Sequence, residues 1–289
     1  MKVTLVSWTP EPERIIAAAA ILCYQRATPD EAWEQAANKK RQETLVARLI
    51  QAGHWSAVEH VNFTFGIEGI SRVCSHQLVR HRIASYSQQS QRYADVGDAD
   101  YFVKPPSLVE LEAGESWGDH PRFEELIGQA VAYYRHVTER TKQTARRREE
   151  IYEDARFILP HAGKTNLFWT TNLRNLAQIS SLRLCVLSQW EIRQVMLLCK
   201  KALMEKDFPL LAKLLVIKCI RWGYCDEGDR CCGIRPTHEA VMAVAKKYRD
   251  EVLRADRERG IKYWLRPEDE DIFDLPPRPP DTAEVEGER

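Results

Sequence analysis

Positively charged and hydrogen-bonding side chains are concentrated in the segment Arg80–Tyr93 of this 289-residue chain. Its fourteen positions hold three arginines, one histidine, three serines and three glutamines, and no acidic residue. A solvated charged face usually interleaves lysine and glutamate, and this segment has neither. Arginine offers a planar pair of donors to phosphate, and serine hydroxyls add further hydrogen bonds. The composition therefore favours a site for an anionic, hydrogen-bonding ligand over an ordinary charged surface.

The spacing within this segment resembles the signature of the flavin-dependent thymidylate synthases. That pattern runs Arg-His-Arg, two residues, Ser, and then a polar run that ends Ser-x-Arg. The chain departs from the common pattern at Ser87, where Asn is usual, and at Gln88, where Glu is usual. Both replacements keep hydrogen-bonding capacity, but Gln88 lacks the negative charge. The matching positions are Arg80, His81, Arg82, Ser85, Ser90 and Arg92.

Two shorter segments extend the resemblance on either side of the signature. Gly53–His60 is similar to a Gly-His-x-Ser/Thr-x-x-Glu-His segment of the family, in which the hydroxyl at Ser56 contacts the flavin and His54 lies near it. Asp154–Pro160 is similar to an Ala-Arg-x-x-Leu-Pro segment. That similarity implies that Arg156 reaches the nucleotide of a neighbouring subunit. The alternative is a surface arginine that ends a helix before Pro160, and the functional interpretation is favoured because the whole segment matches.

A helix predicted from Leu173 to about Leu187 carries polar residues on two sides. At about 100° per residue, Arg174 and Gln178 lie close to one face and Arg183 lies on roughly the opposite side. The resemblance implies that the first group binds flavin and that Arg183 activates the nucleotide. Leu187 departs from the family, in which histidine is frequent at that position.

The resemblance implies a methyltransferase that carries out the reductive methylation of dUMP to dTMP. Methylenetetrahydrofolate would donate the carbon, and FAD reduced by NADPH would carry the hydride. The catalytic residue implied is Arg183. The flavin ligands implied are Ser56, Arg80, His81, Arg82, Gln88, Asn172, Leu173, Arg174 and Gln178. The nucleotide ligands implied are Gln77, Arg80, Gln88, Gln89, Ser90, Gln91, Arg92, Arg156 and Arg183. A homotetramer with shared sites is implied as well.

Two other functions stay open on the residues. The departures at Gln88 and Leu187 fit a flavoprotein that binds FAD and nucleotide without turnover. The arginines of Arg80–Arg92 fit a non-enzymatic RNA-binding module, but 42 basic and 42 acidic residues give no net charge, which weighs against it. There is no Gly-x-Gly-x-x-Gly run, so a Rossmann loop would not hold the FAD.

The composition is that of a globular chain, with 44% hydrophobic and 29% charged residues. The apolar start is too short for a signal peptide and no membrane-length apolar run follows, so we expect a cytoplasmic protein. Zinc ligands commonly have short spacings, which four cysteines near the C-terminus fit poorly: Cys219, Cys225, Cys231 and Cys232. A structural role is therefore favoured for them over metal binding, and we expect no metal.

Hydrophobic periodicity predicts an α+β chain. The resemblance implies the thymidylate synthase-complementing protein fold, a single domain with a central, largely antiparallel sheet flanked by helices and a C-terminal helical extension. We expect the catalytic domain to span 1–235, and 236–289 to be a charged helix followed by a disordered proline-rich tail. Strands are predicted at 2–8, 61–67, 101–103 and 165–172. Helices are predicted at 11–25, 28–52, 70–79, 121–152, 173–187, 188–204 and 237–260.

Overall fold

A computed structural model describes residues 1–114, 117–144 and 146–258 of the chain. It has two compact units, of which the first comprises Met1–Trp222 and the second begins at Gly223. In the second unit, Cys225 pairs with Thr237 in an isolated β-bridge, which joins residues on both sides of the boundary predicted at 235. The predicted proline-rich tail lies outside the described residues.

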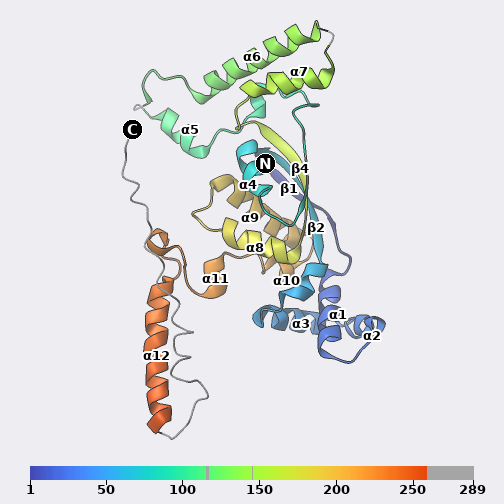
Figure 1. The fold of residues 1–289 in the computed structure, drawn as a ribbon, viewed down its shortest axis with the longest axis vertical. Coiled ribbons are helices and arrows are strands. Elements are labelled where there is room, and N and C mark those ends of the chain that lie inside the picture. The colour runs from blue at the N-terminus through green and yellow to red at the C-terminus, as the bar shows by residue number, and fades with distance from the viewer. Residues whose placement is uncertain (115–116, 145, 259–289) are drawn as a thin grey trace. The chain divides into compact units, whose positions relative to one another are not determined.

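The first unit is built on a four-stranded antiparallel sheet in the order β1-β2-β4-β3. Figure 1 shows β1, β2 and β4 of this sheet. The strands are β1 (Lys2–Trp8), β2 (Asn62–Ser71), β3 (Ser85–Gln88) and β4 (Lys164–Asn172). The predicted α+β class with an antiparallel sheet is therefore confirmed, as are the strands at 2–8, 61–67 and 165–172. Strand β3 lies inside the signature segment, where no strand was predicted, and it pairs with β4.

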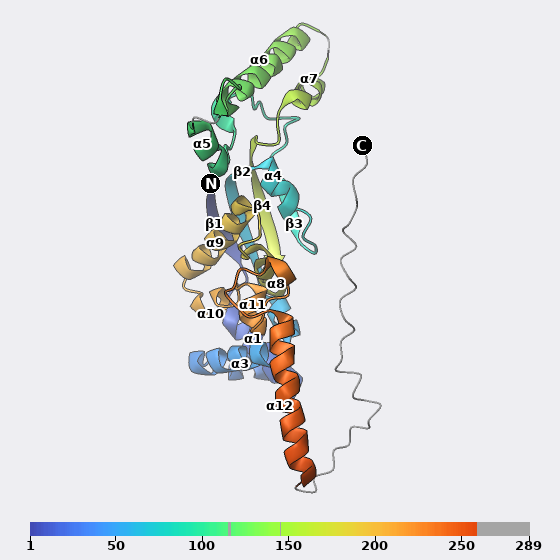
Figure 2. The same ribbon diagram turned by 90° about the vertical axis from the view of Figure 1, so that its left-hand side faces the viewer.

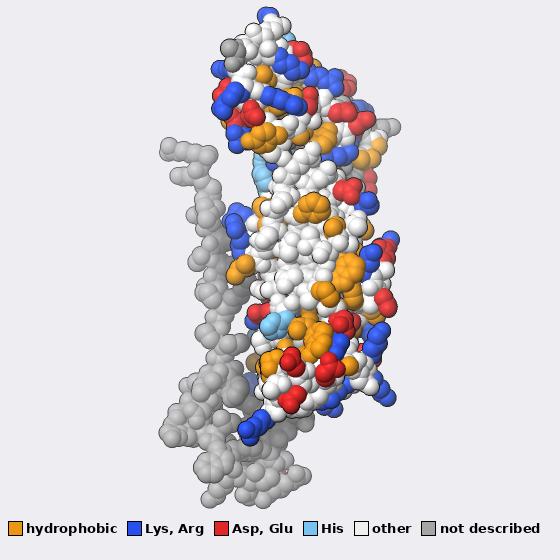
Figure 3. Space-filling model, turned by 90° about the vertical axis from the view of Figure 1, so that its right-hand side faces the viewer, with side chains coloured by type: hydrophobic (Ala, Val, Ile, Leu, Met, Phe, Trp, Pro, Cys, Tyr) orange, Lys and Arg blue, Asp and Glu red, His pale blue; other side chains and the backbone are white. Residues whose placement is uncertain are grey.

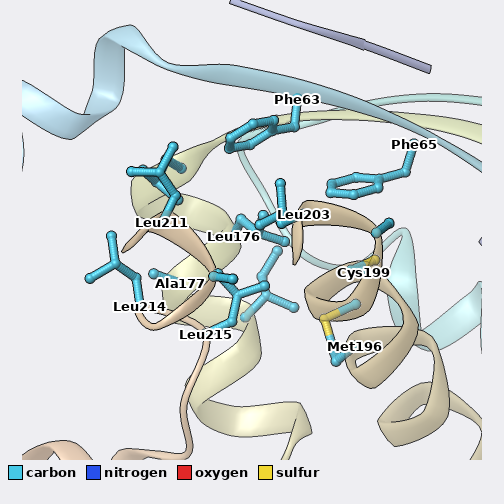
Figure 4. Packing of buried hydrophobic residues seen from close by; sticks show 14 of the residues in the cluster. Phe63, Phe65, Leu176, Ala177, Met196, Cys199, Leu203, Leu211, Leu214 and Leu215 are labelled. Carbon is cyan, nitrogen blue, oxygen red and sulfur yellow. The ribbon is translucent and has the colours of Figure 1, made fainter. Parts of the chain in front are cut away.

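Alternation along the strands gives the sheet one buried and one open face. Phe65 of β2 and Trp169 of β4 are fully buried and belong to the main hydrophobic core, and Phe65 lies beside core side chains of the helices (Figure 4). The opposite face carries Val6, Phe168 and small polar side chains, and Phe168 is 54% exposed. Viewed from the side away from the helices, charged side chains are sparse in the middle of the molecule (Figure 3). The helices thus cover one face of the sheet only.

The helices and 3₁₀ turns connect and cover these strands. The α-helices are α1 (Pro12–Tyr24), α2 (Pro29–Gln35), α3 (Lys39–Gln51), α4 (Arg72–Leu78), α5 (Pro106–Ala113), α6 (Phe123–Lys142), α7 (Arg148–Ala155), α8 (Leu173–Arg183), α9 (Trp190–Glu205), α10 (Pro209–Ala212), α11 (Lys218–Trp222) and α12 (His238–Glu258). The 3₁₀ turns are η1 (Trp55–His60), η2 (Ala99–Tyr101), η4 (Arg156–Ile158) and η5 (Gly228–Arg230). Figure 2 shows α4 and β3 beside β4, so the signature segment runs along this edge of the sheet.

Four predicted elements differ from the structure. The helix predicted at 28–52 is two helices, because Asn38 accepts a hydrogen bond from Arg41 N at 3.0 Å and starts α3 anew. The helix predicted at 121–152 also breaks in two, and Glu150 accepts from Arg147 N at 3.2 Å to begin α7. The helix predicted to reach Leu187 ends at Arg183. In place of a strand at 101–103, η2 is followed by an isolated bridge from Phe102.

Candidate active site

Tyr86 organises the signature segment around its own hydroxyl. The hydroxyl lies 2.9 Å from the carbonyl oxygen of Leu78 and 2.8 Å from that of His81, so it joins the end of α4 to the Arg-His-Arg run. The ring stacks on Trp169 of β4. Burial raises the pKa of Tyr86 to about 12, so the hydroxyl keeps the proton that it donates. This role of Tyr86 was not predicted, since a tyrosine in a polar run carries no signal of its partners.

Helix α8 approaches the same segment from the other side. The Asn172 side chain caps the helix by accepting from Asn175 N at 2.8 Å. The Asn175 amide then donates to the carbonyl oxygen of Ile83 at 2.9 Å. Asn172, predicted as a flavin ligand, therefore uses its side-chain oxygen inside the chain, and Asn175 is a contact that the sequence did not indicate.

Arg183 and His81 meet between these two elements. The Arg183 Nε donates to the His81 Nε2 at 2.9 Å, across 102 positions of sequence. Because Nε2 accepts, the imidazole is neutral and its proton is on Nδ1. Burial lowers the pKa of His81, and the nearby Arg183 charge lowers it further. The arginine predicted to activate a nucleotide thus lies beside the centre of the signature.

Four other flavin ligands are predicted on α8 and η1, and they differ in exposure and in their contacts. Arg174 is half-exposed and forms an ion pair with Glu59 of η1. Gln178 and Ser56 are exposed. Leu173 is fully buried, and its backbone N–H donates to Val61 at 2.8 Å. Its side chain and its amide are therefore both engaged in the core.

Gln88 and Gln89 make contacts that fix β3 against its neighbours. Gln88 Nε2 donates to the Ser75 hydroxyl at 3.1 Å and to the Thr165 hydroxyl at 3.2 Å. The Ser75 hydroxyl donates its proton to the carbonyl oxygen of Arg72 at 3.1 Å and therefore accepts from Gln88, a bond that an ionised glutamate could not make. The Thr165 hydroxyl could serve either side chain. Gln89 Oε1 accepts from Tyr101 at 3.1 Å.

The remaining nucleotide ligands predicted in and before the signature differ in exposure. Gln77 and Ser90 are half-buried, and Ser90 Oγ accepts from Arg92 N at 3.2 Å. Gln91 is 8% exposed, so its side chain is nearly closed off from solvent in this chain. Arg92 is exposed and forms an ion pair with Glu153 of α7.

A cluster of cations lies where α4 begins. The Arg72 Nη2 donates to the carbonyl oxygen of Gln89 at 3.1 Å, while its Nε is buried and has no hydrogen-bond partner among the described residues. Burial lowers the pKa of Arg72, the nearby Tyr101 raises it, and Arg156 lowers it. Arg72 and Arg156 therefore lie close enough to repel each other. Arg72 was not predicted as a site residue, although an arginine in the predicted helix 70–79 was a usable signal.

Two arginines of the signature have no acidic partner. Arg80 and Arg82 are both exposed, and neither forms an ion pair with any residue that the structure describes. Within those residues, no group of three or more His, Cys, Asp or Glu side chains is placed to hold a metal ion. No helix in the described ranges has the length and apolar character needed to span a bilayer.

Comparison with known proteins places this site in a family. Residues 4–210 match the family model described as thymidylate synthase complementing protein. A flavin-dependent thymidylate synthase of Nitratidesulfovibrio vulgaris is 39% identical over 249 residues, which cover 83% of this chain and 97% of the relative. One from Pyrococcus furiosus is 39% identical over 237 residues, which cover 79% and 91%. The chain therefore belongs to the thymidylate synthase complementing protein family.

Solved structures agree on the fold. The flavin-dependent thymidylate synthase ThyX from Helicobacter pylori, solved in complex with FAD and dUMP, aligns with a TM-score of 0.52. It is 24% identical and covers 74% of this chain and 100% of that one. At this level of identity the likeness establishes the shared fold, and with it the arrangement of the sheet and its covering helices.

Proposed function

We propose that this chain is a flavin-dependent thymidylate synthase that converts dUMP to dTMP. Methylenetetrahydrofolate is the proposed carbon donor, and FAD reduced by NADPH is the proposed hydride carrier. The observation that carries the proposal is the hydrogen bond between Arg183 and His81, which lies in sequence between two arginines that form no ion pair with a described carboxylate. The relatives are flavin-dependent thymidylate synthases, and the residues at this site have the chemistry that such a reaction needs.

The site offers cationic and neutral hydrogen-bond donors of the kind that FAD needs. A dinucleotide diphosphate needs fixed cations, and Arg80 and Arg82 offer two guanidiniums that are not neutralised by a described carboxylate. Arg174, Ser56 and Gln178 add exposed donors from α8 and η1. When bound, FAD would supply the hydride chemistry, so the chain itself must bind and orient.

The proposed nucleotide site uses the other side of the same segment. Arg92, Arg156 and Gln77 are the candidate ligands of the dUMP phosphate and sugar, together with Ser90, Gln88, Gln89 and Gln91. The Arg183 guanidinium is the proposed activator. Held against the edge of the uracil ring, it would stabilise the ionised ring, in which C5 is the nucleophile. The neutral His81 orients Arg183 through its Nε2 acceptor and leaves the full cationic charge on the guanidinium.

We propose a homotetramer with shared sites. The open face of the sheet supports it, because a hollow of about 500 Å³ lies there, lined by Val6, Phe168 and Ser87 and with Lys2 and Glu68 also among its residues. The exposed aromatic ring of Phe168 on this face suits coverage by another subunit. Arg156 is the proposed donor to a neighbouring subunit's nucleotide, and mixing Arg156→Ala with Arg92→Ala subunits should restore part of the activity.

We also propose a cytoplasmic location and a single catalytic domain over 1–235 with an extension after it. Cys74 and Cys199 are buried and take part in no disulfide, which suits a reducing compartment. The proposed reaction depends on neither the location nor the domain boundary.

The purified protein tests the proposal in two measurements. Its absorbance spectrum should show bound or added FAD. Incubation with dUMP, methylenetetrahydrofolate and NADPH should then yield dTMP. A yellow protein that oxidises NADPH but makes no dTMP would select a flavoprotein without synthase turnover. A colourless protein that binds RNA in a salt-sensitive manner would overturn the proposal altogether.

A further inference from the structure

Glu191 is a buried carboxylate that has no part in the chemistry proposed above. It lies in the first turn of α9 and is 1% exposed. Its Oε1 accepts from Ser71 N at 2.6 Å, and its Oε2 accepts from the Ser71 hydroxyl at 2.5 Å. Ser71 is the residue from which α4 starts, and its Oγ also accepts from Cys74 N at 3.0 Å. Glu191 therefore binds the cap of α4.

Hydrogen bonds and two helix N-termini, rather than a cation, offset the cost of burying the Glu191 carboxylate. Glu191 forms no ion pair with any residue of the described ranges. Both of its oxygens accept hydrogen bonds, which is the pattern of an ionised carboxylate. It lies at the N-terminal ends of α9 and α4, where the backbone dipoles favour a negative charge. A buried carboxylate held in this way is costly to displace, since its hydrogen bonds would be lost in a medium of low dielectric constant.

The turn from α8 to α9 holds α4 at both of its ends. Glu191, at the start of α9, binds the cap of α4. Arg183, at the end of α8, donates to His81, which follows the last residue of α4 by three positions. Both charges act on the thiol of Cys74 within α4, whose pKa burial raises far above its usual range. Helix α4 carries Gln77 and leads directly into Arg80.

We propose that Glu191 is a positioning residue for the nucleotide site. It fixes where α4 begins relative to α9, and thereby sets where Gln77, Arg80 and His81 lie relative to Arg183. This inference rests on the proposed function for the identity of the nucleotide, dUMP. Its physical core, the attachment of α4 to α9, stands without that assignment.

Glu191→Gln separates the effect of the hydrogen bonds to Ser71 from the effect of side-chain size. It keeps the size of the side chain, but its amide nitrogen cannot accept from Ser71. One buried donor of Ser71 then loses its acceptor, which costs on the order of 1–3 kcal/mol. We expect the dissociation constant for dUMP, measured by calorimetry on the flavin-loaded protein, to rise about tenfold. The affinity for FAD should change less than about twofold, because η1 and α8 keep their own contacts.

Alkylation of buried thiols reports on α4 itself, independently of any ligand. Cys74 on α4 and Cys199 on α9 are both fully buried. In Glu191→Gln, peptide mass spectrometry should show Cys74 reacting about tenfold faster with iodoacetamide, and Cys199 at its wild-type rate. Glu205→Gln is the control on the same helix. Its carboxylate is 61% exposed and lies 3.7 Å from Lys201, so both thiols and the dUMP affinity should stay as in the wild type.

The outcomes separate the two proposals. Unchanged Cys74 reactivity, or faster Cys74 labelling with unchanged dUMP affinity, would overturn the positioning role. Equal acceleration of Cys74 and Cys199 would show general unfolding and would also overturn it. If Glu191→Gln does not fold, Ser71→Ala removes the hydroxyl contact to Glu191 together with the cap on Cys74 N, keeps the Ser71 N–H contact to Glu191, and should give the same pattern. A wild-type protein that does not bind dUMP would overturn the proposed function, while the labelling would still test how α4 is attached.

Discussion

The candidate site is built from two halves that are stabilised in different ways. The α8 half stands on the main core, where Leu173 and Leu176 are fully buried. The signature half, from Arg80 to Gln88, exposes Ile83 at 89% and carries exposed arginines at 80 and 82. Hydrophobic burial fixes the first half, whereas a few polar contacts fix the second. The difference teaches that substitutions in the two halves should fail in different ways, the first in folding and the second in binding and turnover.

The α8 half should show the largest effect on stability. Leu176→Ala removes a fully buried side chain that packs against Phe63 and Leu203 (Figure 4), and such changes typically cost about 2–5 kcal/mol of unfolding free energy. Urea unfolding measures it. The folded fraction should retain near-normal affinity for dUMP. A variant that kept its stability but lost dUMP binding would break the division between the two halves.

Arg183 belongs to both halves, and its loss should lower the rate of dTMP formation. Removing one preorganised charge contact typically costs about 2.7–4 kcal/mol in the transition state, or roughly 10²–10³ in rate. Arg183→Ala should therefore bind FAD and accept electrons from NADPH, yet form little dTMP. Arg183→Lys should recover only part of the rate, because a point charge does not reproduce the planar fork. Stopped-flow flavin reduction alongside a dTMP assay separates the steps. Equal loss in both would make Arg183 structural.

Tyr86 tests the polar attachment of the signature half. Tyr86→Phe keeps the stack on Trp169 but removes the hydrogen bond to the carbonyl oxygens of Leu78 and His81. Such a bond contributes about 0.5–1.5 kcal/mol. The FAD dissociation constant should rise severalfold, with a small decrease in the thermal unfolding midpoint. A large decrease in that midpoint with unchanged FAD affinity would place Tyr86 with the core half instead.

Sequence patterns predicted the α8 half better than the signature half, for a physical reason. Alternation and helical periodicity report burial, so β2, β4 and the start of α8 were predicted correctly. The Asn175–Ile83 and Arg183–His81 hydrogen bonds join residues far apart in sequence, as does the stack of Tyr86 on Trp169. Periodicity carries no information on such pairs. The break before α3 shows the opposite case. Its signal, the capping Asn38, was present in the sequence, but the prediction of one helix over 28–52 did not use it.

The smallest effect should come from pH, acting through His81. Burial and the Arg183 charge lower the pKa of His81 below 6.5 in the folded chain. As the pH falls below 6.5, the unfolded chain therefore takes up a proton at this position before the folded chain does. The stability is complete above 6.5 and is lost as the pH decreases toward the folded pKa. Protonation would also replace the Nε2 acceptor by a donor and release Arg183.

Unfolding midpoints measured between pH 5 and 8 check this dependence. His81→Gln retains an oxygen that can accept from Arg183, so it should flatten the loss of stability at acidic pH. Burial and the charges of His161 and Arg72 lower the pKa of His76 as well, so His76→Gln should remove a separate part of the slope. The effect is small because both imidazoles are only partly shielded from water, which screens their charges. An unchanged slope in His81→Gln would mean that the polar attachment of the signature half does not depend on a neutral imidazole.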